Sequence, residues 1–137
     1  MWDRWDKATE SEEIEEIIEQ YFSMFDTGRH FVKMLEEIIR KDVYSRGGSG
    51  CEFSLWWEQY DFRRDDYFEE WMYPGPKKIR FSGSISKFAE GCYADLEYDE
   101  YYRVLEQYSR KYSTEFPQNA EEIALYMQKM RVKLGME

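Results

Sequence analysis

The 137-residue chain contains one histidine, two cysteines and three prolines, and these shortages exclude several kinds of site. Hydrolysis that needs a histidine as general base could use only His30, which lies three residues after Thr27. That position fits a helix-capping or surface role better than catalysis. Two cysteines and one histidine cannot form a four-ligand zinc site, and the chain has no CxxC motif. We therefore predict a protein that is not an enzyme, with no metal site and no cofactor.

The chain also lacks the GxGxxG and GxxxxGK[ST] motifs that bind dinucleotides and nucleotide phosphates. The glycine-rich segment 47–50 is not followed by a lysine, and it predicts a flexible loop. No stretch approaches 18 consecutive apolar residues, and the first residues have no signal-peptide pattern. We expect a cytoplasmic protein that has no contact with a membrane. Cys51 and Cys92 are then expected to be free thiols, although a disulfide between them stays open.

Positive charge is also in short supply. The chain has 19 lysines and arginines against 29 acidic residues, which gives a formal net charge of −10. Such a protein is repelled by nucleic acid and by anionic membranes, so neither is expected as a direct partner. A basic partner would be attracted. Acidity also serves solubility, so net charge alone does not decide the function.

The acidic residues are concentrated in two segments, which raises the possibility of divalent metal binding or carboxylate catalysis. Residues 52–70 contain seven acids and two arginines, and residues 89–100 contain five acids and no base. Their spacing does not fit an EF-hand loop, which needs glycine at the sixth position and glutamate at the twelfth. Acidic pairs occur by chance in a chain with 29 carboxylates. A small carboxylate enzyme therefore remains an alternative without a specific motif.

Apolar spacing predicts four helices. Residues at i, i+3, i+4 and i+7 predict a helix after a capping box of Thr9 and Glu12, and a second helix after the break at residues 26–28. The same spacing predicts a third helix from Tyr98 that ends before Pro117. A fourth helix is predicted from a cap at Asn119. The methionine and tyrosine stripes of these last two helices favour a core role over a recognition role.

Alternation of apolar and polar residues predicts three strands between the helix pairs. They are Cys51 to Trp57, Lys77 to Ile85 and Gly91 to Leu96. Outward bases on the second strand could pair with an outward glutamate on the first. The predicted fold is α+β, with two N-terminal helices, a small antiparallel sheet and two C-terminal helices in one domain over residues 1–137.

Residues 51–73, CEFSLWWEQYDFRRDDYFEEWMY, combine many aromatic rings with many carboxylates. Aromatic rings supply large contact areas at low entropic cost, and carboxylates supply negative potential. Phe53, Leu55 and Trp57 are expected in the core, but the remaining rings are too many to bury together. We predict a binding surface for a positively charged protein. Its members are Trp56, Glu58, Tyr60, Asp61, Phe62, Asp65, Asp66, Tyr67, Glu69, Glu70 and Trp71, with Asp95, Glu97 and Asp99.

Two segments carry a family resemblance. One is GCEFSLWW at residues 50–57, which precedes the acidic aromatic loop, and the other is DLEYDEYYRVL at residues 95–105. With Glu115-Phe116-Pro117 and the terminal amphipathic helix, they resemble the immunity proteins of bacterial contact-dependent growth inhibition (CdiI), of the type paired with ribonuclease toxins.

The resemblance implies a non-enzymatic cytoplasmic inhibitor. Such a protein binds and blocks the C-terminal nuclease domain of its own toxin, often a tRNA-cleaving one. The expected partner is therefore a cognate nuclease domain, and a ribonuclease must present basic groups to hold phosphates. An acidic mimic of nucleic acid that inhibits DNA-binding enzymes is the alternative, and it predicts broad inhibition instead of strict pairing. The toxin's identity and the oligomeric state stay open.

Overall fold

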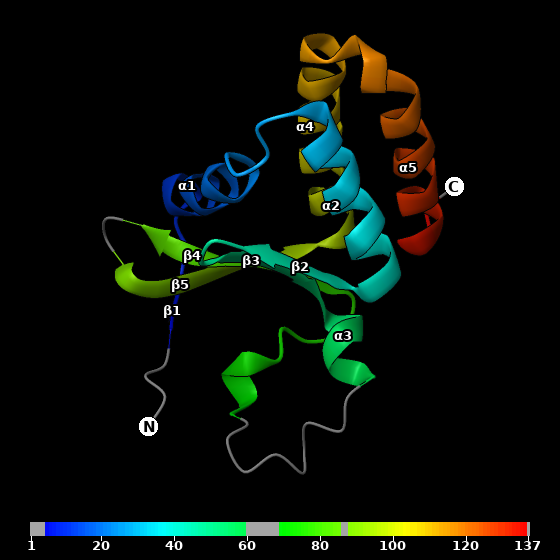
Figure 1. Cartoon of the computed structure of the whole chain (residues 1–137). Coiled ribbons are helices and arrows are strands. Elements are labelled where there is room, and N and C mark those ends of the chain that lie inside the picture. Colours follow the sequence, from blue (N-terminus) through cyan, green and yellow to red (C-terminus); the bar gives the residue numbers. More distant parts are fainter. Residues whose placement is uncertain (1–4, 60–68, 86–87, 137) are drawn as a thin grey trace.

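The computed structural model describes residues 5–59, 69–85 and 88–136. A five-stranded sheet has the strand order β1-β5-β4-β3-β2. Its strands are β1 (Asp6–Lys7), β2 (Val43–Arg46), β3 (Ser49–Phe53), β4 (Lys78–Ile85) and β5 (Phe88–Glu97). One face of the sheet carries the long helices α1 (Ser11–Phe22), α2 (Gly28–Lys41), α4 (Tyr98–Glu115) and α5 (Ala120–Lys133) (Figure 1). The short elements α3 (Ser54–Glu58) and η2 (Glu70–Met72) lie on the opposite side, and η3 (Pro117–Asn119) joins α4 to α5.

The four predicted long helices are present, and their apolar stripes form the core. The largest fully buried side chains include Tyr21 and Phe22 of α1, Phe31 and Leu35 of α2, and Tyr101 of α4. Burial of these large side chains supplies most of the stabilisation of such helices, because intrinsic helix propensity is a weak contribution. The aromatic and methionine stripes of α4 and α5 are core residues, as the helical spacing favoured.

The helix termini follow the predicted caps in part. Thr27 caps α2, because its Oγ1 accepts a hydrogen bond from the backbone N–H of His30 at 3.2 Å. The capping box predicted at Thr9 is wrong, because α1 begins at Ser11 after Glu10, whose side chain makes no capping bond. The reciprocal box forms instead at the start of α4, between Glu97 and Glu100.

The sheet departs from the prediction in three places. Strand β1 pairs in parallel with β5, so the sheet is not wholly antiparallel. Strand β2 was not predicted; it forms a hairpin with β3 through a turn at Gly47 and Gly48, both at positive φ, within the glycine-rich segment that predicted a loop. Residues 54–58 form helix α3, although they were predicted to continue the first strand. A short apolar run such as Ser54–Glu58 does not distinguish strand from helix by its pattern alone.

The two cysteines are free and buried, in agreement with the predicted thiols. Cys51 of β3 lies opposite Phe81 of β4, whereas Cys92 of β5 lies opposite Gly83. Strand β4 therefore separates them, and two strand spacings amount to about 9–10 Å. A disulfide requires Cα atoms within about 7 Å, so these strands hold the thiols too far apart to bond.

Candidate functional site

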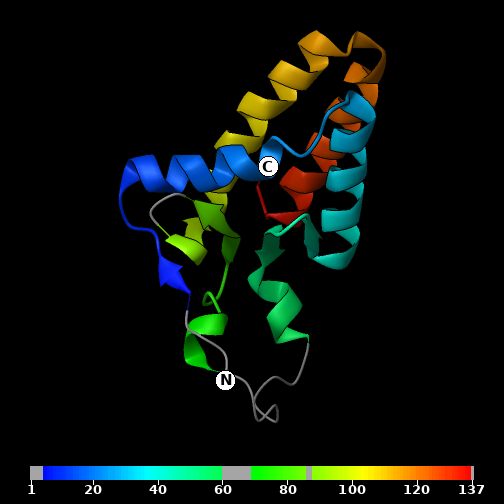
Figure 2. The same ribbon diagram turned by 60° about the vertical axis from the view of Figure 1, so that its left-hand side comes forward.

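The face of the sheet that points away from the long helices carries polar side chains. Side chains alternate along a strand, so Cys51, Phe53, Ile79 and Phe81 fill the core, and the residues between them point outward. We call this side the outer face. It is formed by Glu52 of β3, Lys78, Arg80 and Ser82 of β4, and Tyr93, Asp95 and Glu97 of β5. Figure 2 shows α3 and η2 on the same side of the sheet.

Arg80 is the centre of a buried cluster on the outer face. Its side chain is 7% exposed and forms a two-point ion pair with Asp95, which is 10% exposed, at 2.7 Å and 3.0 Å. Its Nη1 also donates to the carbonyl oxygens of Trp71 (2.6 Å) and Met72 (3.1 Å). The guanidinium carbon lies 4.0 Å from the ring centroid of Tyr93. Arg80 thus attaches η2 to the sheet.

Asp95 was predicted to contact a basic partner, and the structure places its carboxylate against Arg80. Its contact with a partner therefore stays a prediction that would require this pair to open. The two neighbouring acids are on the surface: Glu97 pairs with Lys78 and caps α4, and Asp99 is 60% exposed and pairs with Arg103 at 3.3 Å. All three acids thus have a partner within the chain.

Helix α3 and the segment around η2 bring together several of the predicted surface residues. Trp56 is 37% exposed and packs edge-on against Trp57, with 5.0 Å between ring centroids. Glu58 is exposed and accepts a hydrogen bond from the Tyr73 hydroxyl at 2.6 Å, which links α3 to the η2 segment. Glu69 and Glu70 are exposed as well.

Trp71 is half-buried, stacks on Tyr93 at 5.9 Å between centroids, and donates its indole N–H to Glu69. Trp56, Glu58, Glu69, Glu70 and Trp71 therefore lie on the outer side of the sheet, and we call these five residues the acidic–aromatic surface. The other predicted members, Tyr60, Asp61, Phe62, Asp65, Asp66 and Tyr67, lie outside the described residues. Among the expected core residues, Phe53 is fully buried, while Leu55 and Trp57 are half-buried.

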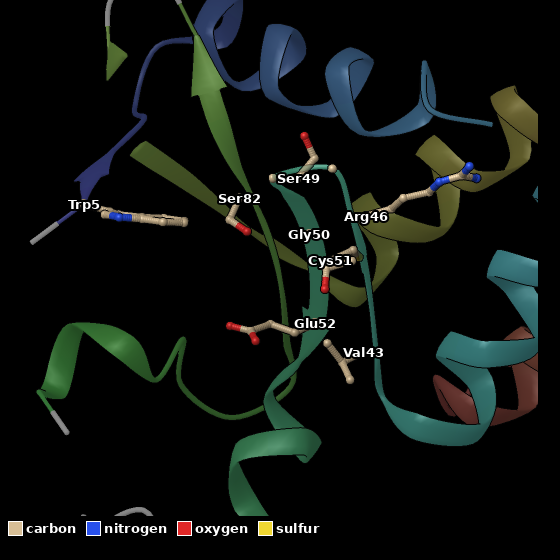
Figure 3. A pocket seen from close by; sticks show the side chains of 11 residues that line it. Trp5, Val43, Arg46, Ser49, Gly50, Cys51, Glu52 and Ser82 are labelled. Atoms are coloured by element: carbon tan, nitrogen blue, oxygen red, sulfur yellow. The ribbon is translucent and has the colours of Figure 1, made fainter. Parts of the chain in front are cut away.

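A hollow of about 440 Å³ opens on the outer face of the sheet, beside Glu52. Trp5, Glu52 and Ser82 line it together with β2 and the β2–β3 turn (Figure 3). Burial raises the pKa of the Glu52 carboxyl above its ordinary value, and a 3.0 Å hydrogen bond from Trp57 Nε1 opposes that shift. Glu52 and Trp5 were not among the predicted site residues. The outward strand position of Glu52 was a signal, but nothing in the sequence places Trp5 beside it.

Within the residues that the structure describes, no group of three or more histidine, cysteine or acidic side chains is arranged to hold a metal ion. None of the helices in this part of the chain is both long enough and apolar enough to cross a membrane.

Comparison with known families decides the class of the protein. A family model described as CDI immunity protein, where CDI stands for contact-dependent growth inhibition, matches residues 14–127. The chain belongs to the CDI immunity protein family. Membership implies an immunity function through binding of a cognate toxin, and proteins of this family are generally not enzymes. No curated protein and no solved structure matches the chain.

The matched range of this CDI immunity protein includes β2 to β5, α3 and η2. The acidic–aromatic surface and Glu52 therefore lie within the family match. Trp5 and β1 precede it.

Proposed function

We propose that this CDI immunity protein neutralises a ribonuclease toxin, with tRNA as the toxin's substrate, by covering the toxin's basic surface with its own acidic–aromatic surface. The observation that carries the proposal is the arrangement of α3 and η2, where Trp56 and three exposed carboxylates share one side of the sheet. Inhibition then results from occupancy and needs no catalytic group in the immunity protein.

The charges favour such a pairing. A ribonuclease domain must hold a phosphate backbone, so it presents lysine and arginine side chains. Opposite potentials accelerate the encounter of two proteins, and the formal net charge of −10 supplies one of them. Specificity for a single toxin then comes from particular contacts instead of bulk charge. Aromatic side chains such as Trp56 are frequent among the residues that dominate binding energy.

The predicted members of residues 60–68 belong to the same proposal, because that segment connects α3 to Glu69 in the chain. We expect charge reversal at Asp65 and Asp66 to weaken inhibition as well. Asp95 contributes through Arg80, which attaches the η2 segment to the sheet.

The test uses the C-terminal domain of the toxin encoded directly upstream of the immunity gene. Binding is measured by calorimetry and protection by tRNA cleavage. A variant with Glu58, Glu69 and Glu70 changed to lysine is compared with a control in which Glu12, Glu15 and Glu121 are changed to lysine. The control residues are exposed on α1 and α5, in the helical layer, and the net charge change is the same.

We expect the surface variant to lose at least about tenfold in affinity, which corresponds to roughly 1.4 kcal/mol, while the control loses much less. Equal losses in the two variants would show that bulk charge, not this surface, drives binding. Inhibition of a panel of unrelated nucleases by the wild-type protein would favour the nucleic-acid mimic instead.

A further inference from the structure

Glu52 carries the surplus negative charge of the outer face. On the described part of that face, Arg80 is paired with Asp95 and Lys78 with Glu97, so these two pairs cancel. Glu52 lies opposite Arg80 on β4 and is attracted by it, but within the same residues Glu52 forms no ion pair, and its hydrogen bond comes from the neutral indole of Trp57. A carboxylate that is partly removed from water without an ion pair of its own loses solvation, and a cation that binds it directly restores part of that loss.

One wall of the hollow beside Glu52 is formed by the indole ring of Trp5. Figure 3 shows the Glu52 carboxylate, the Ser82 hydroxyl and the Trp5 indole directed toward the same space, while Arg46 points away from it. Trp5 precedes β1, which is fixed to β5 in parallel register and by a 2.8 Å bond from Ala8 N to Tyr93 O.

Glycine at position 91 makes room for the Trp5 ring. A Cβ at Gly91 would lie 2.7 Å from Cε2 of Trp5, and the φ of Gly91 is +141°, a value that favours glycine. The indole of Trp5 therefore occupies the space that the side chain of any residue other than glycine would need at position 91. Trp5 precedes the edge strand β1, whereas Glu52 lies on β3, and both side chains line the same hollow.

We propose that this hollow receives a lysine or arginine side chain of the toxin, with the cationic head on Glu52 and the aliphatic stem along Trp5. The volume is within the range of about 300–1,000 Å³ that is typical of ligand sites. Long basic side chains bury their methylene stems on apolar surface, and an indole face attracts the cation itself. The inference rests on the proposed function, because it assigns one contact within the same complex.

Glu52→Gln tests the carboxylate in the full-length protein. Glutamine keeps an oxygen that can accept from Trp57 and removes the charge. We expect the Kd for the upstream-encoded toxin domain to rise roughly tenfold to hundredfold, the effect of losing a hydrogen bond to a charged group. The control is Glu121→Gln, which removes one carboxylate from the exposed start of α5 and should stay within about twofold of wild type.

The same samples separate the two proposals. If the wild-type protein fails to bind the toxin domain, the proposed function is wrong. If wild type binds and Glu52→Gln binds equally well, the proposed function survives and the cation site is overturned.

A second measurement needs no toxin. Nα-acetyl-lysine N-methylamide is titrated into the protein, and the indole N–H signal of Trp5 is followed by NMR, with Trp5→Phe used to assign it. Nα-acetyl-norleucine N-methylamide, a neutral analogue, is the matched probe. We expect a saturable shift with the lysine probe alone, and its loss in Glu52→Gln. An equal shift with norleucine, a shift that persists in Glu52→Gln, or no saturable shift would overturn the assignment.

Discussion

The Glu52 carboxylate lowers the stability of the free protein, and we propose that it binds a cation of the toxin in the complex. Because burial raises its pKa, ionisation of Glu52 is less favourable in the folded chain than in the unfolded chain. A group with a raised folded pKa contributes stability below its unfolded pKa, and that contribution is lost as the pH rises through the folded pKa. The ionised carboxylate at neutral pH is therefore tolerated, not stabilising.

Glu52→Gln should accordingly increase the free energy of unfolding at pH 7. The gain should shrink as the pH falls through the raised pKa to about pH 4, because the wild-type carboxyl then keeps its proton. Urea unfolding of both proteins at the two pH values measures the gain at pH 7 and its decrease at the lower pH. A variant that is less stable at pH 7 would mean that attraction to Arg80 outweighs burial. Higher stability combined with weaker toxin binding is the result expected of a residue kept for function.

Arg80, in contrast to Glu52, should stabilise the folded chain, because its charge is paired with Asp95. Arg80→Met leaves the buried carboxylate of Asp95 without its cation and removes both bonds to the η2 carbonyls. Loss of one partner of a buried ion pair costs about 3–5 kcal/mol, and we expect a loss of that size in urea unfolding.

Two controls interpret the Arg80 result. Arg103→Ala breaks the exposed pair with Asp99 and should cost less than about 1 kcal/mol. The double variant Arg80→Met with Asp95→Leu removes both charges and should recover part of the loss. If Arg80→Met were as stable as Arg103→Ala, the pair would be solvated and Asp95 would be available to a partner.

At the scale of elements, the first residue of α2, Gly28, packs against the turn between α4 and α5. A Cβ at Gly28 would lie 2.5 Å from Asn119 Oδ1 and 2.8 Å from Phe116 Cβ. Gly28→Ala should therefore destabilise the protein by about 1–3 kcal/mol, the range for overpacking, although alanine normally favours a helix. Thermal unfolding checks this prediction, with Arg29→Ala at the exposed neighbouring position as the control. A stabilised Gly28→Ala would mean that the α4–α5 turn moves aside easily.

The elements that could be predicted from the sequence are those with many periodic residues. Helices α1, α2, α4 and α5 and strands β4 and β5 each repeat their pattern over at least eight residues. Helix α3 has five residues, and β1 has two. Elements this short contain too few repeats to fix a period. The parallel pairing of β1 also joins residues 86 positions apart, such as Asp6 and Cys92, and no local sequence pattern indicates such a pairing.

The residues that point outward from each strand could be predicted as well. The segments that pack over those residues could not. Glu52 lies on β3 and Asp95 on β5, the two strands that flank β4, and both acids point outward. Asp95 pairs with Arg80, which also binds the η2 carbonyls, whereas Glu52 borders a hollow that Trp5 lines on one side. The difference arises from segments that pack on the sheet from elsewhere in the chain. A sequence pattern therefore indicated an acidic side without showing which acids remain available.

At the scale of the whole molecule, charge and aromatic contact should act on different rate constants. Toward the basic toxin proposed above, the excess of negative charge would act at a distance and accelerate encounter, and salt screens such attraction beyond a Debye length of about 10 Å at 0.1 M. The contacts proposed for Trp56 would form only in the docked complex, so we expect them to slow dissociation. This separation gives the proposed function a kinetic signature that neither charge nor burial alone would produce.

We therefore expect association with the toxin domain to slow at least about tenfold between roughly 0.05 M and 0.5 M salt, with dissociation changing much less. Trp56→Ala should leave association nearly unchanged and raise the dissociation rate about tenfold or more, as expected for a tryptophan anchor. Leu125→Ala is the matched control, because Leu125 is 55% exposed on α5 and lies in the helical layer. Stopped-flow fluorescence and surface-based dissociation measure the two rates. If Trp56→Ala and Leu125→Ala dissociated at the same rate, the side of the sheet formed by α3 and η2 would not be the interface, even if salt slowed the encounter as expected.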